Sequence, residues 1–236
     1  PEQDIPNKAQ ILEELNSLTS NIMTDSFDIP NVTARSDIPD YDSWRLSIQT
    51  ALDAMADAKY RKIVLARMAS LRFERAFAPV ALMLRMREHS SGCYMFLFQP
   101  EPDMAFMCCS PERLYRRQGR IVETEAIAGT RPRGNSESED AAFGQQLKSS
   151  EKDTREHRLV VQSIKESLLP LRETDLSFVG SPETVIKLNK VQHLKTSLIA
   201  TLKDTISDTV LLEALHPTAA VGGYPKGDAV SEIGRL

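Results

Sequence analysis

The chain has 236 residues, of which 41% are hydrophobic and 26% are charged, a composition typical of a globular protein with a substantial core. Lys and Arg total 29 against 33 Asp and Glu, and the net charge of −4 argues against a nucleic-acid partner. No apolar run approaches the ~20 residues needed to cross a bilayer, so we expect no membrane partner. Three cysteines, two of them adjacent, fit neither a disulfide framework nor a zinc site and predict buried thiols in a reducing compartment.

The N-terminal part of the chain combines two helical patterns with a polar stretch. Apolar residues at helical spacing predict amphipathic helices over Ala9–Met23 and Tyr41–Lys59. Between them, Asp25–Asp40 is rich in Asp and Pro, which is typical of a connector. We therefore predict an N-terminal helical and connector segment over residues 1–59. Because Pro1 is not an initiator methionine, we expect that residues have been removed upstream.

The next part of the chain is rich in strand patterns. Lys62–Phe73, with its Ile, Val and Leu residues, predicts a strand, and Pro79–Glu88 predicts a short helix. Four β-rich runs separated by Pro, Asp and Gly follow, namely Cys93–Gln99, Met104–Cys109, Arg113–Arg117 and Arg120–Ile127.

The last part returns to helices. The polar stretch Gly134–Asp140 predicts a mobile loop, and Glu151–Leu169 predicts a long helix that ends before Pro170. Val185–Leu188 and Val191–Leu202 predict a β-pair, and a further helix begins near Val210. Helices mixed with consecutive strands, without a regular βαβ alternation, indicate an α+β fold.

Six short motifs occur in a fixed order along the chain. They are KIVLAR with Lys62, SPERL over residues 110–114, AGTRPR over 128–133, EKDTREH over 151–157, QHL over 192–194 and LHPT over 215–218. Together they resemble the chorismate-utilising enzymes, and in particular the isochorismate synthases. The resemblance implies packed antiparallel β-sheets with flanking helices and a partial chorismate-binding catalytic domain over residues 60–236. It also implies a cytoplasmic protein, or a plastid protein if the organism is a photosynthetic eukaryote.

Lys62 is the first candidate catalytic residue. On a strand it would share one face with Val64 and Ala66, and burial among apolar groups lowers a lysine's pKa towards that of a general base. Taken alone, a lysine at a strand start more often extends its ammonium to water. The resemblance implies that Lys62 is the base that activates water.

Glu112 is the second candidate catalytic residue. Pro111 favours an extended or turn geometry, which places Glu112 at a bend between two strand runs. A carboxyl held there in apolar surroundings can stay protonated and act as a general acid. Taken alone, a turn glutamate more often pairs with a nearby cation such as Arg113 or Arg116. The resemblance implies that the general acid occupies the position of Glu112.

Four residues are candidates for substrate binding. Gly129 permits close backbone approach, and the Thr130 hydroxyl suits a carboxylate, although the pair alone is also typical of a strand-ending turn. The resemblance implies that His193 and Thr218 line the chorismate pocket; each alone is more often structural. Ala128 stands where aminodeoxychorismate synthases carry a lysine nucleophile, which favours water as the nucleophile here.

Asp153 and Glu156 are spaced i, i+3 on the long predicted helix, so they share one face. Two buried carboxylates would repel each other without a cation, and Mg²⁺ prefers oxygen ligands. Asp153 also fits a capping box with Ser150. The resemblance implies that Glu156, before His157, is a metal ligand and that Asp153 is an outer partner of the metal site.

The implied reaction is the Mg²⁺-dependent conversion of chorismate to isochorismate, by addition of water at ring carbon two and loss of the hydroxyl at carbon four. The alternatives are a salicylate synthase, which goes on to eliminate pyruvate, and a non-catalytic module of a larger or split protein. After Ile233 the family continues with two metal-binding glutamates, an arginine and a Gly-rich loop. We therefore expect this chain to be inactive or nearly so alone and to need the missing C-terminal half as a partner.

Overall fold

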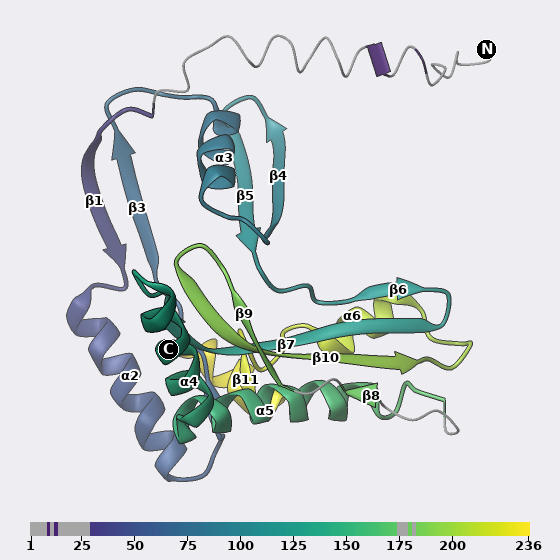
Figure 1. Ribbon diagram of the computed structural model, residues 1–236. Helices are drawn as coiled ribbons and strands as arrows, with labels where there is room; N and C mark the ends of the chain where they lie inside the picture. The colour runs from purple at the N-terminus through teal and green to yellow at the C-terminus, as the bar shows by residue number, and fades with distance from the viewer. Residues whose placement is uncertain (1–8, 10–11, 14–28, 174–178, 181–182) are drawn as a thin grey trace.

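The computed structural model describes residues 9, 12–13, 29–173, 179–180 and 183–236 (Figure 1). Most of the helix predicted over Ala9–Met23 therefore lies outside the described residues. The strands are β1 (Val32–Ile38), β2 (Lys62–Ile63), β3 (Met68–Phe73), β4 (Tyr94–Glu101), β5 (Met104–Ser110), β6 (Arg116–Gln118), β7 (Ile121–Pro132), β8 (Val179–Gly180), β9 (Thr184–Lys187), β10 (Val191–Thr201) and β11 (Gly223–Tyr224). The helices are α2 (Tyr41–Ala56), α3 (Pro79–Glu88), α4 (Glu137–Ser149), α5 (Glu151–Leu168), α6 (Asp208–Leu215) and α7 (Lys226–Ile233).

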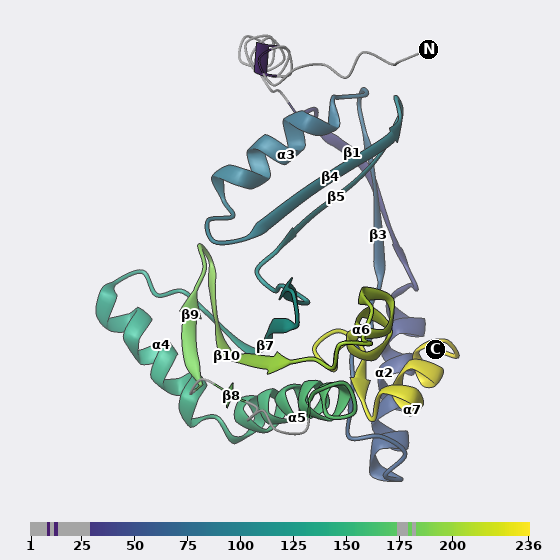
Figure 2. The same ribbon diagram turned by 90° about the vertical axis from the view of Figure 1, so that its right-hand side faces the viewer.

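The largest sheet has the strand order β6-β7-β10-β8, and β9 pairs with the N-terminal part of β10. All of its pairings are antiparallel, and β7 and β10 run together from Val191 opposite Pro132 to Thr201 opposite Ile121. Helices α4 and α5 lie along one side of these two strands, while the β4–β5 hairpin and α3 lie on the other side (Figure 2). This arrangement confirms the predicted α+β class.

The core forms between the sheet and α5. Val160, Ile164 and Leu168 follow one another at helical spacing on α5, and all are at most 1% exposed. They pack against Val122 of β7 and Leu198 of β10, which are fully buried. Burial of each such side chain contributes about 1.5–3 kcal/mol. This packing holds the N-terminal turns of α5, and hence Asp153 and Glu156, against β7.

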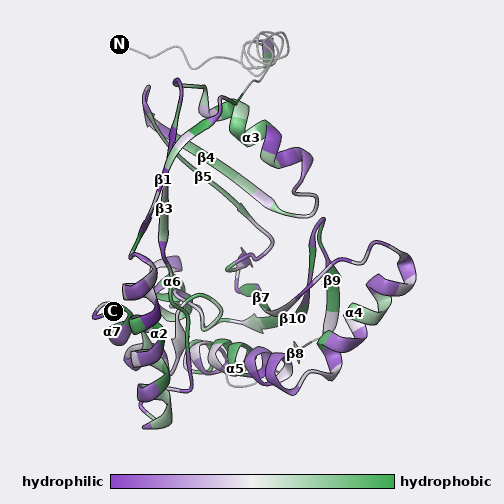
Figure 3. Cartoon of the chain, turned by 90° about the vertical axis from the view of Figure 1, so that its left-hand side faces the viewer, coloured by the Kyte–Doolittle hydropathy of each residue, from purple (hydrophilic) through white to green (hydrophobic). Residues whose placement is uncertain are grey.

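The β4–β5 hairpin presents an aromatic face that the described chain leaves uncovered. Tyr94, Phe96, Phe98 and Phe106 are all more than half exposed, and Phe98 pairs directly with Phe106 across the two strands. Figure 3 shows apolar residues running along both strands of this hairpin. An exposed apolar patch of this kind is typical of a protein–protein or domain interface.

Most predicted elements are confirmed within a few residues, including α2, α3, α5 and the β9–β10 pair. The connector predicted over Asp25–Asp40 is wrong in part, because Val32–Ile38 forms β1 and pairs with β3. The strand predicted over Lys62–Phe73 is also wrong in part, since it is interrupted between β2 and β3. In both cases a pairing distant in sequence decides the structure. The β1–β3 pairing crosses the predicted boundary between residues 1–59 and 60–236, and that division stays a prediction.

The loop predicted over Gly134–Asp140 is wrong in its second half, where α4 begins at Glu137. Ser136 caps this helix by accepting a hydrogen bond from the Glu139 backbone N–H at 3.2 Å. Asp140 is buried in the first turns and forms ion pairs with Arg133 at 2.6 Å and Lys187 at 2.8 Å. The Arg133 hydrogen bond is the main reason that the pKa of Asp140 lies well below its usual range. These contacts bind the turn after β7 to both α4 and β9.

None of the helices in the described ranges combines the length and apolar character that a membrane span requires.

Candidate active site

Lys62 is buried where β2 meets the C-terminal part of the chain. β2 pairs with β11, which places Lys62 opposite Tyr224. The Lys62 ammonium donates a 2.6 Å hydrogen bond to the carbonyl oxygen of Ala219 and lies 3.5 Å from Oε1 of Glu156. Burial lowers the pKa of Lys62 from its usual value, although the Glu156 charge opposes that shift. A lowered pKa is what a lysine general base requires. The Lys62 ammonium, however, lies beside a carbonyl and a carboxylate and not on the apolar strand face that the sequence predicted.

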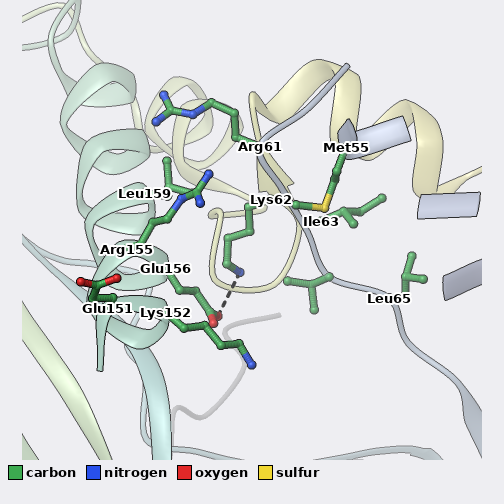
Figure 4. A pocket seen from close by; sticks show the side chains of 11 residues that line it. Met55, Arg61, Lys62, Ile63, Leu65, Glu151, Lys152, Arg155, Glu156 and Leu159 are labelled. Carbon is green, nitrogen blue, oxygen red and sulfur yellow. Dashed lines mark ion pairs between the residues drawn. The ribbon is translucent and has the colours of Figure 1, made fainter. Parts of the chain in front are cut away.

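Lys62 and Glu156 point towards each other at one side of a pocket of about 680 Å³ (Figure 4). The pocket lies between α2, the segment that follows β2 and the first turns of α5. Its lining combines apolar and charged side chains, namely Met55, Arg61, Lys62, Ile63, Val64, Leu65, Glu151, Lys152, Arg155, Glu156 and Leu159. Four cations against two carboxylates give the lining a net positive charge, which suits an anionic ligand.

Glu112 lies in a turn that is itself held by hydrogen bonds. The Ser110 hydroxyl accepts a hydrogen bond from the Glu112 N–H at 3.2 Å. Burial raises the pKa of the Glu112 carboxyl to about 7, against the effect of a hydrogen bond from the Ile127 backbone. Arg113 pairs with Glu123 and Glu125 instead of with Glu112. Glu112 is therefore a partly buried carboxyl whose pKa lies near neutral pH, and Arg113 is not paired with it.

Lys62 and Glu112, fifty positions apart in sequence, are close enough that the charge of each alters the pKa of the other. The 680 Å³ pocket is lined by Lys62 but not by Glu112. A second pocket of about 300 Å³ is lined by Pro111, which precedes Glu112, and by His193. Glu112 itself lines neither of these two pockets, so its closeness to Lys62 rests on their mutual effect on pKa.

Gly129, Thr130 and His193 come together at a β-bulge. The register between β7 and β10 shifts there, because His193 pairs with Thr130 and Leu194 pairs with Ala128. The extra residue, Gly129, has a φ of +76°. Nδ1 of His193 lies 3.1 Å from the Gly129 carbonyl oxygen and 3.1 Å from the Thr130 hydroxyl. A carbonyl oxygen can only accept, so this contact favours the tautomer with its proton on Nδ1.

We expect replacement of Gly129 by alanine to lower the free energy of unfolding by about 2 kcal/mol, because the backbone is left-handed and the new Cβ would crowd its neighbours. That Cβ would lie 3.1 Å from Cβ of Asp153 and 3.3 Å from Cδ1 of Leu147. Urea denaturation measures the effect. Gly119→Ala is the matched control, since Gly119 has a φ of +59° and nothing within 4 Å of an added Cβ. Equal losses in both variants would contradict the close approach to α5.

The two predicted metal-site carboxylates have different partners. Asp153 is buried and forms a 2.7 Å ion pair with Arg131. Burial acts most strongly on its pKa and would raise it, but hydrogen bonds from Ser150 and Arg131 outweigh burial and leave the pKa below its usual value. Glu156 is partly exposed and faces Lys62 in the pocket. Ser150 also caps α5 through the Asp153 N–H, as the capping-box interpretation predicts.

Thr218 lies buried in the turn that follows α6. Its hydroxyl accepts a 3.3 Å hydrogen bond from the Ala220 N–H, and its carbonyl accepts one from Gly222 at 2.9 Å. The next residue, Ala219, is the one that binds the Lys62 ammonium. Thr218 therefore shapes the turn beside the candidate base, and the structure places it near Lys62 and not at the Gly129 bulge.

Several charged residues of the site did not emerge from the sequence. Arg131 is the partner of Asp153, and Arg113 and Lys195 both pair with Glu125. The alternation of Glu123 and Glu125 with small and apolar residues in a buried strand is the pattern that would have indicated a charged face on β7.

The chain matches the family described as "Chorismate binding enzyme" over residues 2–236, and it belongs to this family. Among curated relatives, it is 34% identical to the isochorismate synthase MenF of Escherichia coli over 84% of this chain and 45% of that protein. It is 32% identical to MenF of Bacillus subtilis over 94% of this chain and 47% of that protein. The solved structure of the menaquinone-specific isochorismate synthase MenF from E. coli superimposes with a TM-score of 0.83 at 29% identity, covering 97% of this chain and 53% of that one. The chain thus spans about half the length of the relatives that it matches.

Proposed function

We propose that the protein converts chorismate to isochorismate, with Lys62 as the general base and Glu112 as the general acid. The observation that carries this proposal is the opposed pair of pKa shifts in one region: burial lowers the pKa of an amine and raises that of a carboxyl to about 7. Two titratable groups whose pKa values are displaced in this way are suited to exchange protons near neutral pH. The sequence similarity to isochorismate synthases supports the same reaction.

The proposed chemistry moves one hydroxyl group and conserves all atoms. Lys62 in its neutral form takes a proton from water while the water oxygen bonds to ring carbon two. The ring double bonds shift, the bond from carbon four to its hydroxyl breaks, and Glu112 gives its proton to the departing hydroxyl. A water molecule enters and another leaves, so the net reaction is an isomerisation. Holding water, ring and both residues in one geometry supplies proximity in addition to proton transfer.

The substrate carboxylates are proposed to meet the cationic pocket and the bulge on β7. Arg61, Lys152 and Arg155 bring positive charge to the pocket that contains Lys62. At the bulge on β7, the Thr130 hydroxyl and the Gly129 backbone lie beside His193. Thr218 supports the turn that holds Lys62 and completes the proposed substrate-binding set.

Magnesium is proposed as the cofactor, with Glu156 as the residue of this chain that would bind it. When bound, Mg²⁺ stabilises negative charge on a substrate carboxylate. The described residues hold no group of three His, Cys, Asp or Glu side chains arranged for a metal, and Asp153 is already paired with Arg131. Mg²⁺ often takes only one or two protein carboxylates together with water and substrate, so Glu156 fits as one ligand of a site that needs more. Asp153 remains proposed as its outer partner.

The rest of the site is proposed to come from a segment like the part of the relatives that this chain does not match. Two observations support this. The relatives are about twice as long as the part that this chain matches, and the aromatic face of the β4–β5 hairpin is exposed. A sheet from such a segment would cover that face and bring further ligands to Glu156.

The proposal is tested by chromatography of the products formed from chorismate and Mg²⁺. We expect little or no product from this chain alone, and isochorismate from a fusion of the chain to the unmatched C-terminal part of the E. coli relative. Removal of Mg²⁺ with a chelator should abolish that activity. Accumulation of salicylate would instead identify a salicylate synthase. A folded fusion that leaves chorismate unchanged would indicate a non-catalytic module.

A further inference from the structure

The turn that carries Glu112 is bound to β7 by the two residues that follow the acid, Arg113 and Leu114. Beyond Glu112, the Thr124 hydroxyl donates a 2.6 Å hydrogen bond to the carbonyl oxygen of Leu114. The Arg113 guanidinium lies 3.3 Å from Glu123 and 3.4 Å from Glu125. Because Arg113 is the peptide neighbour of Glu112, these ion pairs set the position of the acid.

Glu125 is the most buried member of this set. It is 8% exposed, and its Oε1 lies 2.9 Å from the ammonium of Lys195 on β10, in addition to the contact with Arg113. Glu125 and Ile127 are two positions apart on β7, so they lie on the same face of the strand. The Ile127 backbone hydrogen-bonds the Glu112 carboxyl. Glu125 thus contacts Arg113, the residue next to Glu112 in the chain, and its charge is close enough to raise the pKa of Glu112.

Two charges on the elements packed around Glu112 shift its pKa, and they act in opposite directions. Lys62 on β2 favours the ionised carboxylate, whereas Glu125 on β7 opposes it. Arg113 within the turn and Lys195 on β10 are cations that would also favour ionisation, but both are paired with Glu125. Without Glu125, Lys195 would lose this partner, while Arg113 would keep its ion pair with Glu123.

We propose that Glu125 is a positioning residue for Glu112: its ion pairs with Arg113 and Lys195 anchor the turn of the acid, and its fixed negative charge beside the carboxyl favours the protonated form. The inference rests on the proposed role of Glu112 as general acid. An ion-pair network of this kind is usually structural alone. A positioning role and a purely structural role predict different signs for the shift in the Glu112 titration midpoint when one charge is removed at a time.

The test is a ¹³C NMR titration of the glutamate carboxyls in this chain, with the Glu112 signal assigned by Glu112→Gln. In the wild type, Glu112 should titrate near the value of about 7 that its burial produces. Glu125→Gln should lower that midpoint by about 1 pH unit, since it removes a like charge and frees Lys195 from its ion pair with Glu125. Lys195→Met should raise the midpoint, because the charge of Glu125 is then less compensated. Glu123→Gln is the matched control, since Glu123 also pairs with Arg113 but is more exposed, and it should leave the midpoint within 0.3 of a unit, roughly the noise of such a shift.

Opposite shifts in Glu125→Gln and Lys195→Met would support the inference, because mere loosening of the turn would admit water and lower the midpoint in both variants. Equal shifts, or no shift in either variant, would overturn it while the role of Glu112 stood. A wild-type midpoint near 4.5, the ordinary value for a glutamate, would overturn the general acid itself. If Glu125→Gln fails to fold, Lys195→Met alone tests the inference: a raised midpoint would support it, and a lowered or unchanged midpoint would overturn it.

Discussion

Replacement of Lys62 by methionine should lower the turnover of chorismate by about three orders of magnitude, the scale of a lost general base, while the fold stays intact. Methionine keeps most of the buried volume at this 7% exposed position. The partner carboxylate, Glu156, is partly exposed and does not become a buried unpaired charge. The measurement is kcat in a preparation that turns chorismate over, with circular dichroism and thermal unfolding to verify the fold.

Two further variants separate a base from a mere positive charge. Lys62→Arg retains a cation beside Glu156 but cannot give up its proton near neutral pH, so it should be as inactive as Lys62→Met. Lys203→Met is the matched control, because Lys203 also donates to a backbone carbonyl, that of Pro170 at 2.8 Å, but on the surface. Turnover near the wild-type value in Lys62→Met would discard the proposed mechanism.

Replacement of Glu112 by glutamine should have two effects of opposite kind, a loss of turnover by two to four orders of magnitude and a gain in stability at alkaline pH. The folded state raises the pKa of Glu112 from 4.5 to about 7. The folded protein therefore binds this proton more tightly, and the free energy of unfolding falls as the pH rises from about 4.5 to about 7. Above about pH 7 the folded protein carries the full free-energy cost of the ionised Glu112 carboxylate. Glutamine is neutral at every pH, so the variant should be more stable than the wild type by about 2 kcal/mol at pH 8.

Urea denaturation at pH 5 and pH 8 checks the stability effect. At pH 5 the two proteins should differ little, because Glu112 is protonated in the folded wild type. Glu123→Gln serves as the control, since Glu123 pairs with Arg113, the neighbour of Glu112, but is partly exposed and should show no comparable gain at pH 8. The same pH dependence in wild type and Glu112→Gln would mean that Glu112 is not held protonated. In the wild type, turnover should also fall above about pH 7, as Glu112 loses its proton.

Helices and strands whose apolar residues follow a regular helical or strand spacing were predictable from the sequence. α3 matches its predicted bounds because Pro79 starts a run of apolar residues at helical spacing, and α5 ends one residue before the predicted Leu169. The strand β10 alternates buried residues with more exposed ones along its length, which is the period of a half-buried strand.

Elements that depend on distant partners were not predictable in the same way. The segment assigned to β1 is polar and nearly fully exposed, and only its pairing with β3 makes it a strand. β2 is two residues long and exists because β11 pairs with it. At Gly223 a Cβ would overlap the Lys62 carbonyl oxygen, so the glycine permits a contact that spans most of the chain.

The sequence by itself determined the family. It also predicts the reactive side chains, because a base, an acid and a metal-binding carboxylate each require particular residue types within short motifs. Only the tertiary structure decided the partners of those side chains. It paired Lys62 with Ala219 and Glu156, Asp153 with Arg131, and Arg113 with Glu125 instead of Glu112. The physical reason is that burial and neighbouring charge, which set the pKa of Lys62 and Glu112, arise from β2, β7, β10 and the turn after α6 meeting in space.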